Sequence, residues 1–243
     1  AAAIRTIDGG ATWTPMTIPG TDPNVLNYVA FPENSMTGYI GVYPRAGLGK
    51  VLKTTDGGDN WTEIAVGGAL NWSRSCGMAT DNIGVVVGNG GFVIGTTNGF
   101  ESTAVQGPLT IADLTAAAFS PTDPLKGYLI GNDSMHGLIR HTDDGGASLW
   151  DSVTCWPVTA FHGVDVPTSE AAYVCGDSAG TGIILRSVSN TDFFKTTAPA
   201  VPPMHGVCFP VGSDTGYAVG GNAPSYSGFR PAFFWIEGVA EEK

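Results

Sequence analysis

Short apolar runs that begin or end with glycine recur along the chain at intervals of about 45 residues. Nearly every position in these runs is apolar, a pattern that predicts β-strands buried on both faces. A second short strand is expected roughly ten residues before each run. The glycine-containing runs are Thr37–Gly41, Ile83–Gly88, Gly127–Gly131, Ala172–Gly176 and Gly216–Gly220. The preceding strands are Tyr28–Phe31, Cys76–Met78, Ala117–Phe119, Val164–Val166 and Val207–Phe209.

A turn sequence of the type Thr-x-Asp-Gly-Gly-x-x-Trp repeats with the same period. Asp and Asn side chains bond backbone amides further along the chain, Gly supplies a positive φ, and the Trp ring packs the turn onto the sheet. The turn is therefore expected to serve folding rather than function. The clear copies are Ile4–Trp13, Val51–Trp61 and Leu138–Trp150, and the weaker ones are Ile94–Phe100 and Leu185–Phe193.

Together these elements predict an all-β fold, a β-propeller whose blades each read strand, strand, turn hairpin, strand. The chain opens on a turn hairpin and closes on two of the apolar strands, so these halves are expected to complete one blade. The favoured architecture is a single domain over residues 1–243, with five four-stranded blades closed by the N- and C-terminal strands. Six blades are the alternative, because Phe233–Gly238 lies where a further turn strand is due. That segment lacks the Asp-Gly-Gly turn and is interpreted as an extra strand or cap.

The pattern Gly-Tyr-x-x-Gly followed by Ile/Leu-x-x-Thr-x-Asp-Gly-Gly-x-x-Trp resembles the Asp-box (BNR-repeat) propellers over nearly the whole chain. It is similar to the Ycf48/HCF136-like photosystem II assembly and stability proteins and to propellers of the sialidase superfamily. The resemblance implies the propeller fold. It leaves function open, because propellers of this kind include sialidases, other glycosidases, receptors, lectin-like binders and assembly factors.

The formal net charge of −11 argues against nucleic acid or an anionic membrane as a partner, because both would repel this surface. No stretch approaches the roughly 20 apolar residues that span a bilayer, so the chain is not expected to cross one. The expected location is extracellular or extracytoplasmic. Four widely spaced cysteines lack metal-binding spacing and are either buried small hydrophobes or partners in one or two disulfides, namely Cys76, Cys155, Cys175 and Cys208.

Alignment of the repeats places a polar residue at the start of every innermost strand, where equivalent positions form a ring around the axis. Such a ring, with Trp72 among its aromatic neighbours, would suit a small polar ligand or a sugar. The simpler interpretation is that strand starts are exposed and therefore polar. The five aligned residues are Asn27, Arg74, Thr115, His162 and His205.

Asp165 is the weak candidate for catalysis. It interrupts an innermost strand where other blades carry Ala, Gly or Cys, and it is expected to point inward beside His162 as a base or ligand-binding group. A hydrogen-bonded channel residue is the alternative. A sialidase would need converging arginines, which this chain scatters across its blades. Neither a metal site nor a cofactor motif is evident.

The sequence therefore favours a non-enzymatic binding or assembly module that recognises a glycan, a small polar ligand or a protein through the channel mouth and loops. A glycoside hydrolase of sialidase type is the first alternative. A structural subunit of a larger assembly is the second.

Overall fold

All regular structure in the described residues is β-strand apart from one short 3-10 turn, η1 (Asn89–Gly91). No helix in this part of the chain is long and apolar enough to cross a membrane. The computed structural model describes residues 3–19, 25–43, 50–66, 73–102, 104–105, 112–133, 136–148, 150–153, 158–187, 192–196, 201–213, 215–221 and 232–236.

Four of the sheets contain four antiparallel strands in chain order, and we call them blades 1 to 4. Blade 1 comprises β3 (Val25–Ala30), β4 (Gly38–Tyr43), β5 (Lys50–Thr54) and β6 (Thr62–Ala65). Blade 2 comprises β7 (Ser73–Met78), β8 (Gly84–Gly88), β9 (Val93–Thr96) and β10 (Ala104–Val105). Blade 3 comprises β11 (Asp113–Phe119), β12 (Gly127–Asn132), β13 (Gly137–Thr142) and β14 (Asp151–Ser152). Blade 4 comprises β15 (Ala160–Thr168), β16 (Ala171–Ser178), β17 (Thr181–Ser187) and β18 (Phe193–Lys195).

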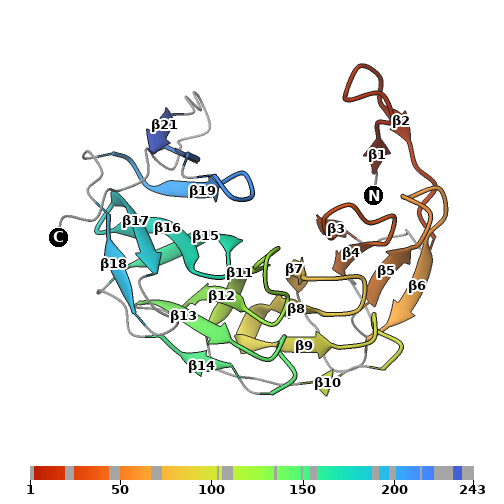
Figure 1. The fold of residues 1–243 in the computed structure, drawn as a ribbon, viewed down its shortest axis with the longest axis horizontal. Helices are drawn as coiled ribbons and strands as arrows, with labels where there is room; N and C mark the ends of the chain where they lie inside the picture. Colours follow the sequence, from red (N-terminus) through yellow and green to blue (C-terminus); the bar gives the residue numbers. More distant parts are fainter. Residues whose placement is uncertain are drawn as a thin grey trace.

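Two smaller sheets complete the described structure. Blade 5 has three strands, β19 (Met204–Cys208), β20 (Gly216–Gly220) and β21 (Ala232–Ile236). The N-terminal hairpin pairs β1 (Ile4–Arg5) with β2 (Thr14–Pro15). Figure 1 shows the sheets following one another along an arc, with β1 and β2 at one end of it and β21 at the other. The first strands of successive blades contact one another along this arc, so β3, β7, β11, β15 and β19 form its inner layer. The predicted order of strands within a blade is confirmed.

The repeated turns share one hydrogen-bond network. In blade 1 the Thr54 hydroxyl accepts the N–H of Gly58 at 3.0 Å and donates to Asp56 at 2.7 Å, while Asp56 accepts the N–H of Asn60 at 2.9 Å. These bonds favour the ionised carboxylate, and those from Asn60 lower the pKa of Asp56 to about 2. The turns beginning at Thr6, Thr96 and Thr142 repeat the arrangement.

Matched residue sizes at two facing positions, compared between blades, show how the inner and second strands pack. In blade 3 the ring of Phe119 lies over Gly127, where an added Cβ would come within 2.6 Å of a ring atom. Phe31 over Gly38 and Phe209 over Gly216 repeat this contact in blades 1 and 5. Blade 4 has Val166 and Ala172 at the corresponding positions, and both lie in one buried cluster. A smaller inner residue thus accompanies the larger residue on the second strand.

The prediction that both termini close the ring is wrong. The edge of β20 expected to receive the N-terminal strand is paired along its whole length with β21, from Gly216 opposite Ile236 to Gly220 opposite Ala232. The segment around Phe233 is therefore the third strand of blade 5. The N-terminal hairpin forms a separate two-stranded sheet. The number of blades stays a prediction.

Two of the cysteines follow the small-hydrophobe interpretation. Cys76 and Cys175 are buried free thiols, and burial raises the pKa of each to about 12. Cys208 is also a free thiol but is exposed. Cys155 lies outside the described residues. No disulfide therefore joins the three cysteines that are described.

Candidate functional site

Every inner strand carries a β-bulge at the same place, near its start. A bulge inserts one residue that has no partner in the ladder, and so it re-aims that side chain. The polar residues aligned from the sequence are the bulge residues of the inner strands. They are Asn27 in β3, Arg74 in β7, Thr115 in β11, His162 in β15 and His205 in β19.

The bulge residues link each blade to the next. Asn27 donates its side-chain amide to the carbonyl oxygen of Ser73 in blade 2 at 2.7 Å. Thr115 donates its hydroxyl to the carbonyl oxygen of Phe161 in blade 4 at 3.3 Å. Two positions that sequence reasoning proposed for ligand binding thus have interblade bonds.

Arg74 makes the corresponding link as an ion pair. Its guanidinium lies 3.1 Å from the carboxylate of Asp113 in blade 3 and also bonds the side chain of Asn89. Both charged side chains are about two-fifths exposed, at 39% and 42%, so solvent screens the pair and its contribution to stability is small.

The two bulge histidines face each other across blades 4 and 5. The ring centroids of His162 and His205 are 4.9 Å apart. His162 Nε2 lies 3.3 Å from a carboxylate oxygen of Asp177, and His205 Nε2 lies 3.3 Å from the carbonyl oxygen of Gly221. The expectation that Asp165 is the carboxylate beside His162 is wrong, because Asp177 holds that place. No group of residues suited to hold a metal ion occurs in the described part of the chain.

Sequence reasoning missed the residues that follow the last glycine of the second strands. Asn132 is the strongest example, because it accepts the N–H of Phe161 at 2.6 Å and donates to the carbonyl oxygen of Phe161 at 2.8 Å. Asn89 and Asp177 occupy the matching places in blades 2 and 4. The signal was a repeated Gly-Asn or Gly-Asp pair at the end of the second strand. Trp72, the aromatic candidate, lies outside the described residues.

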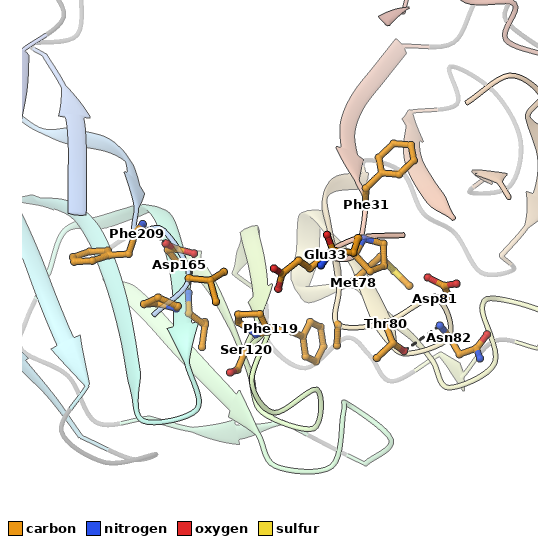
Figure 2. A pocket seen from close by; sticks show the side chains of 17 residues that line it. Phe31, Glu33, Met78, Thr80, Asp81, Asn82, Phe119, Ser120, Asp165 and Phe209 are labelled. Atoms are coloured by element: carbon orange, nitrogen blue, oxygen red, sulfur yellow. Dashed lines mark hydrogen bonds between the residues drawn. The ribbon is translucent and has the colours of Figure 1, made fainter. Parts of the chain in front are cut away.

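A pocket of about 580 Å³ lies at the opposite end of the inner strands. It is bounded by the ends of all five inner strands and the turns that follow them, with Phe31, Met78, Phe119, Val166 and Phe209 at equivalent positions (Figure 2). Each of these residues comes four positions after the bulge of its strand, which corresponds to roughly 13 Å along a strand. The predicted ring and the observed pocket are therefore at opposite ends of the same strands.

Asp165 lines this pocket. Its carboxylate accepts the N–H of Val166 at 3.0 Å and the N–H of Phe209 in blade 5 at 2.5 Å. Burial raises the pKa of Asp165 even though both backbone bonds act to lower it. Because both of its oxygens accept backbone bonds, we interpret the Asp165 carboxylate as a link between blades 4 and 5 rather than as an acid or a base.

Two further carboxylates border the pocket. Asp81 accepts bonds from the hydroxyls of Ser35 and Thr37, at 2.5 Å and 3.0 Å, and so ties blade 2 to blade 1. Glu33 is exposed and makes no hydrogen bond or ion pair to any described residue. Figure 2 shows the Glu33 side chain extending into the pocket toward the wall that carries Asp165 and Phe209.

Solved structures with a similar fold include "YCF48 bound to D1 peptide", with a TM-score of 0.57 and 17% identity over 89% of this chain and 68% of that one. A GH74 enzyme of Niastella koreensis matches with a TM-score of 0.64 and 16% identity over 88% of this chain and 37% of the enzyme. The Dos1 propeller matches with a TM-score of 0.60 and 12% identity over 81% and 53%. No model of a known family and no curated protein sequence matches the chain.

These likenesses establish the β-propeller fold. The chain spans about two thirds of the Ycf48 protein and little more than a third of the GH74 enzyme, at identities that carry no function with them. Chemically, the pocket offers a mixed polar and apolar lining, bound carboxylates and one unbound carboxylate. The bulge end offers polar side chains that are already bonded between blades.

Proposed function

We propose that this chain is a non-enzymatic binding module that holds a segment of a protein partner in the pocket at the ends of its inner strands. The observation that carries the proposal is the pocket itself, to which all five blades contribute. Its volume is within the range of about 300 to 1,000 Å³ that ligand sites occupy. The Ycf48 structure with its D1 peptide supports a protein segment as the occupant, since it shows a peptide bound to a protein of this fold.

The bonding of the carboxylates favours binding over hydrolysis. Asp165 and Asp81 are held by hydrogen bonds from neighbouring blades, which fixes them as parts of the wall. A fixed wall suits recognition, because little conformational entropy is lost when a ligand is bound. The repeated turns belong to the scaffold in this proposal. The Asp-box character of the repeat, expected from the resemblance, and an extracellular or extracytoplasmic location remain parts of the proposal.

Panning a library of random peptides displayed on phage against the immobilised protein tests this function. The first variant is Val211→Arg, because Val211 lines the pocket and is 53% exposed, so the new side chain blocks the pocket without disturbing the core. The matched control is Leu125→Arg, in the corresponding turn of blade 3, where Leu125 is 45% exposed and lies outside the pocket. We expect peptides that bind the natural protein and the control but bind Val211→Arg at least about tenfold more weakly.

Binding of sugars on a glycan array, with no peptide selected, would replace the protein partner with a glycan. Sugar binding that is lost in Thr115→Ala and His205→Ala, but kept in Val211→Arg, would move the site to the bulge end. Native mass spectrometry of the protein, purified together with whatever it binds, tests the remaining alternative, a structural subunit of a larger assembly.

A glycoside hydrolase is the second candidate function, favoured by the two carboxylates Glu33 and Asp165 at one pocket. Hydrolysis of a glycosidic bond needs an acid and a second carboxylate, roughly 5 to 9 Å apart. Release of reducing sugar from a panel of plant and bacterial polysaccharides, abolished in Asp165→Asn, would establish the enzyme. No release from any of them, together with selection of peptides, supports the binding module.

A further inference from the structure

The charge that borders the pocket is of one sign. Glu33, Asp81 and Asp165 contribute carboxylates, and none of the seventeen residues that line the pocket is Lys, Arg or His. The whole chain strengthens this field, with 22 acidic against 11 basic residues. A concave site with low-dielectric walls focuses the potential of its own charges, so a cation is drawn to this site and an anion is repelled.

Glu33 is the carboxylate that remains available to a ligand. Asp165 accepts two backbone N–H bonds and Asp81 accepts two hydroxyl bonds, whereas Glu33 has no partner among the described residues. The Glu33 side chain extends into the pocket from the turn after β3 (Figure 2). A donor with several N–H groups could therefore bond Glu33 without displacing a bond that the protein already makes.

The walls around Glu33 suit a flat cation rather than a compact one. Phe31, Phe119 and Phe209 line the pocket, but the rings of Phe119 and Phe209 are buried inside their own blades, so among these three only Phe31, which is 44% exposed, offers ring surface to a ligand. Aromatic faces attract a guanidinium through their quadrupole, and the planar guanidinium also bonds a carboxylate in a bidentate manner. The ammonium of lysine is more strongly hydrated and therefore loses more when the ligand displaces the water around it.

We infer that the pocket takes an arginine side chain of the bound segment, with Glu33 as its carboxylate partner and the exposed ring surface of Phe31 as its stacking surface. This inference rests on the proposed binding of a protein segment. It adds the chemistry of the occupant. The pocket is large enough for residues next to the arginine, which can pack against the prolines of its lining.

The test uses peptides selected on phage and then synthesised in three forms, with arginine, with lysine, and with citrulline in place of arginine. Citrulline keeps the shape of the side chain but removes its charge. Binding is measured by isothermal titration calorimetry to the natural chain and to two variants. Glu33→Gln removes the proposed partner. Glu170→Gln removes the same charge from an exposed residue in the corresponding turn of blade 4, outside the pocket.

We expect citrulline to weaken binding at least about tenfold and lysine to weaken it less. We expect Glu33→Gln to weaken binding of the arginine form about five- to tenfold, and Glu170→Gln to change it by less than about twofold. The citrulline form should bind the natural chain and Glu33→Gln about equally. Denaturant unfolding of both variants checks that the fold is unchanged. We expect no change, because both glutamates are exposed.

Each other result overturns a defined part. Peptides that lose affinity in Val211→Arg but are indifferent to citrulline and to Glu33→Gln would disprove the arginine and leave the binding function standing. Equal weakening by both Gln variants would show that only the overall charge matters. Failure to select any peptide that Val211→Arg releases would disprove the proposed function itself, and this inference with it.

Discussion

The two ends of the inner strands use the same scaffold in opposite ways. At the start of each strand a bulge residue carries a polar side chain. Three of these side chains bond to the next blade, and the two histidine rings contact each other between blades 4 and 5. At the other end the equivalent residues are apolar and surround a pocket with carboxylates at its border. Regular repetition of a polar residue therefore marked an interblade link, while the repeated apolar positions at the other end border the pocket.

The bulge end should lose the most stability when a bond to a buried residue is removed. Asn132→Ala removes both bonds to the backbone of Phe161, a residue whose side chain is fully buried. We expect a loss of about 1 to 3 kcal/mol in the free energy of unfolding, because a partly buried backbone N–H loses its partner. Urea unfolding measures the loss. The control is Asn89→Ala, whose bond to the partly exposed Arg74 should cost less than about 1 kcal/mol. Equal losses in the two variants would contradict the ranking.

At the pocket end, the packing of the inner strand against the second strand should be sensitive to steric fit. Gly127→Ala places a Cβ within 2.6 Å of the Phe119 ring, and we expect it to lower the free energy of unfolding by about 1 to 3 kcal/mol. Adding Phe119→Val recreates the pair that Val166 and Ala172 form in blade 4. The double variant should be more stable than the sum of the single effects by about 1 kcal/mol, as measured in a double-mutant cycle. Simple additivity would show that the two positions do not fit each other.

The carboxylates of the pocket and of the turns should respond to pH with opposite signs. The pKa of Asp165 is raised in the folded chain, so its contribution to stability is greatest below its unfolded pKa and falls as the pH rises through the folded value. As the pH rises from about 3.5 to about 7, the natural chain should therefore lose stability relative to Asp165→Asn. Urea unfolding at both pH values measures the difference.

Asp56→Asn is the matched variant, since Asn98 holds the equivalent place in blade 2. The pKa of Asp56 is lowered to about 2, so its contribution is present above the unfolded value and is lost as the pH falls toward 2. The natural chain should lose stability relative to Asp56→Asn on acidification. Slopes of the same sign in the two variants would refute the assignment of both groups.

The smallest effect is expected at His205. Its side chain is exposed and its contacts are the ring of His162 and one bond of 3.3 Å. His205→Ala should change the free energy of unfolding by no more than about 0.5 kcal/mol, as exposed residues usually do. His162→Ala, which also loses Asp177, should cost more. A larger loss at His205 would mean that the link between blades 4 and 5 depends on both rings.

Much of the fold was predictable because the bonds that form each repeated turn lie within the repeated sequence itself. The Thr54, Asp56 and Gly58 spacing predicts a turn whose bonds are all local, so no distant partner has to be known. Ring closure was not predictable in the same way. The edge of β20 accepts any strand with a free edge, and pairing with β21 or with β1 leaves the same hydrophobic pattern.

The candidate site divides along the same line. Alignment found the five bulge positions, because equivalent places in a repeat occupy equivalent places in the ring. It could not show that His162 faces Asp177, which lies on the neighbouring strand and is brought close only by the pairing register, rather than Asp165 on its own strand. The pocket was missed because it is formed by the turns and strand ends of all five blades, which only the folded structure brings together.

The bulge links also give the molecule a direction. Asn27 reaches from blade 1 to blade 2, Arg74 from blade 2 to blade 3, and Thr115 from blade 3 to blade 4. In a nearest-neighbour description, each of these links adds a coupling term between two adjacent blades, with the side chain contributed by the earlier blade. Hydrogen exchange would report such a chain as a gradient of protection, in which opening one blade lowers the protection of its neighbours in proportion to the strength of the link between them.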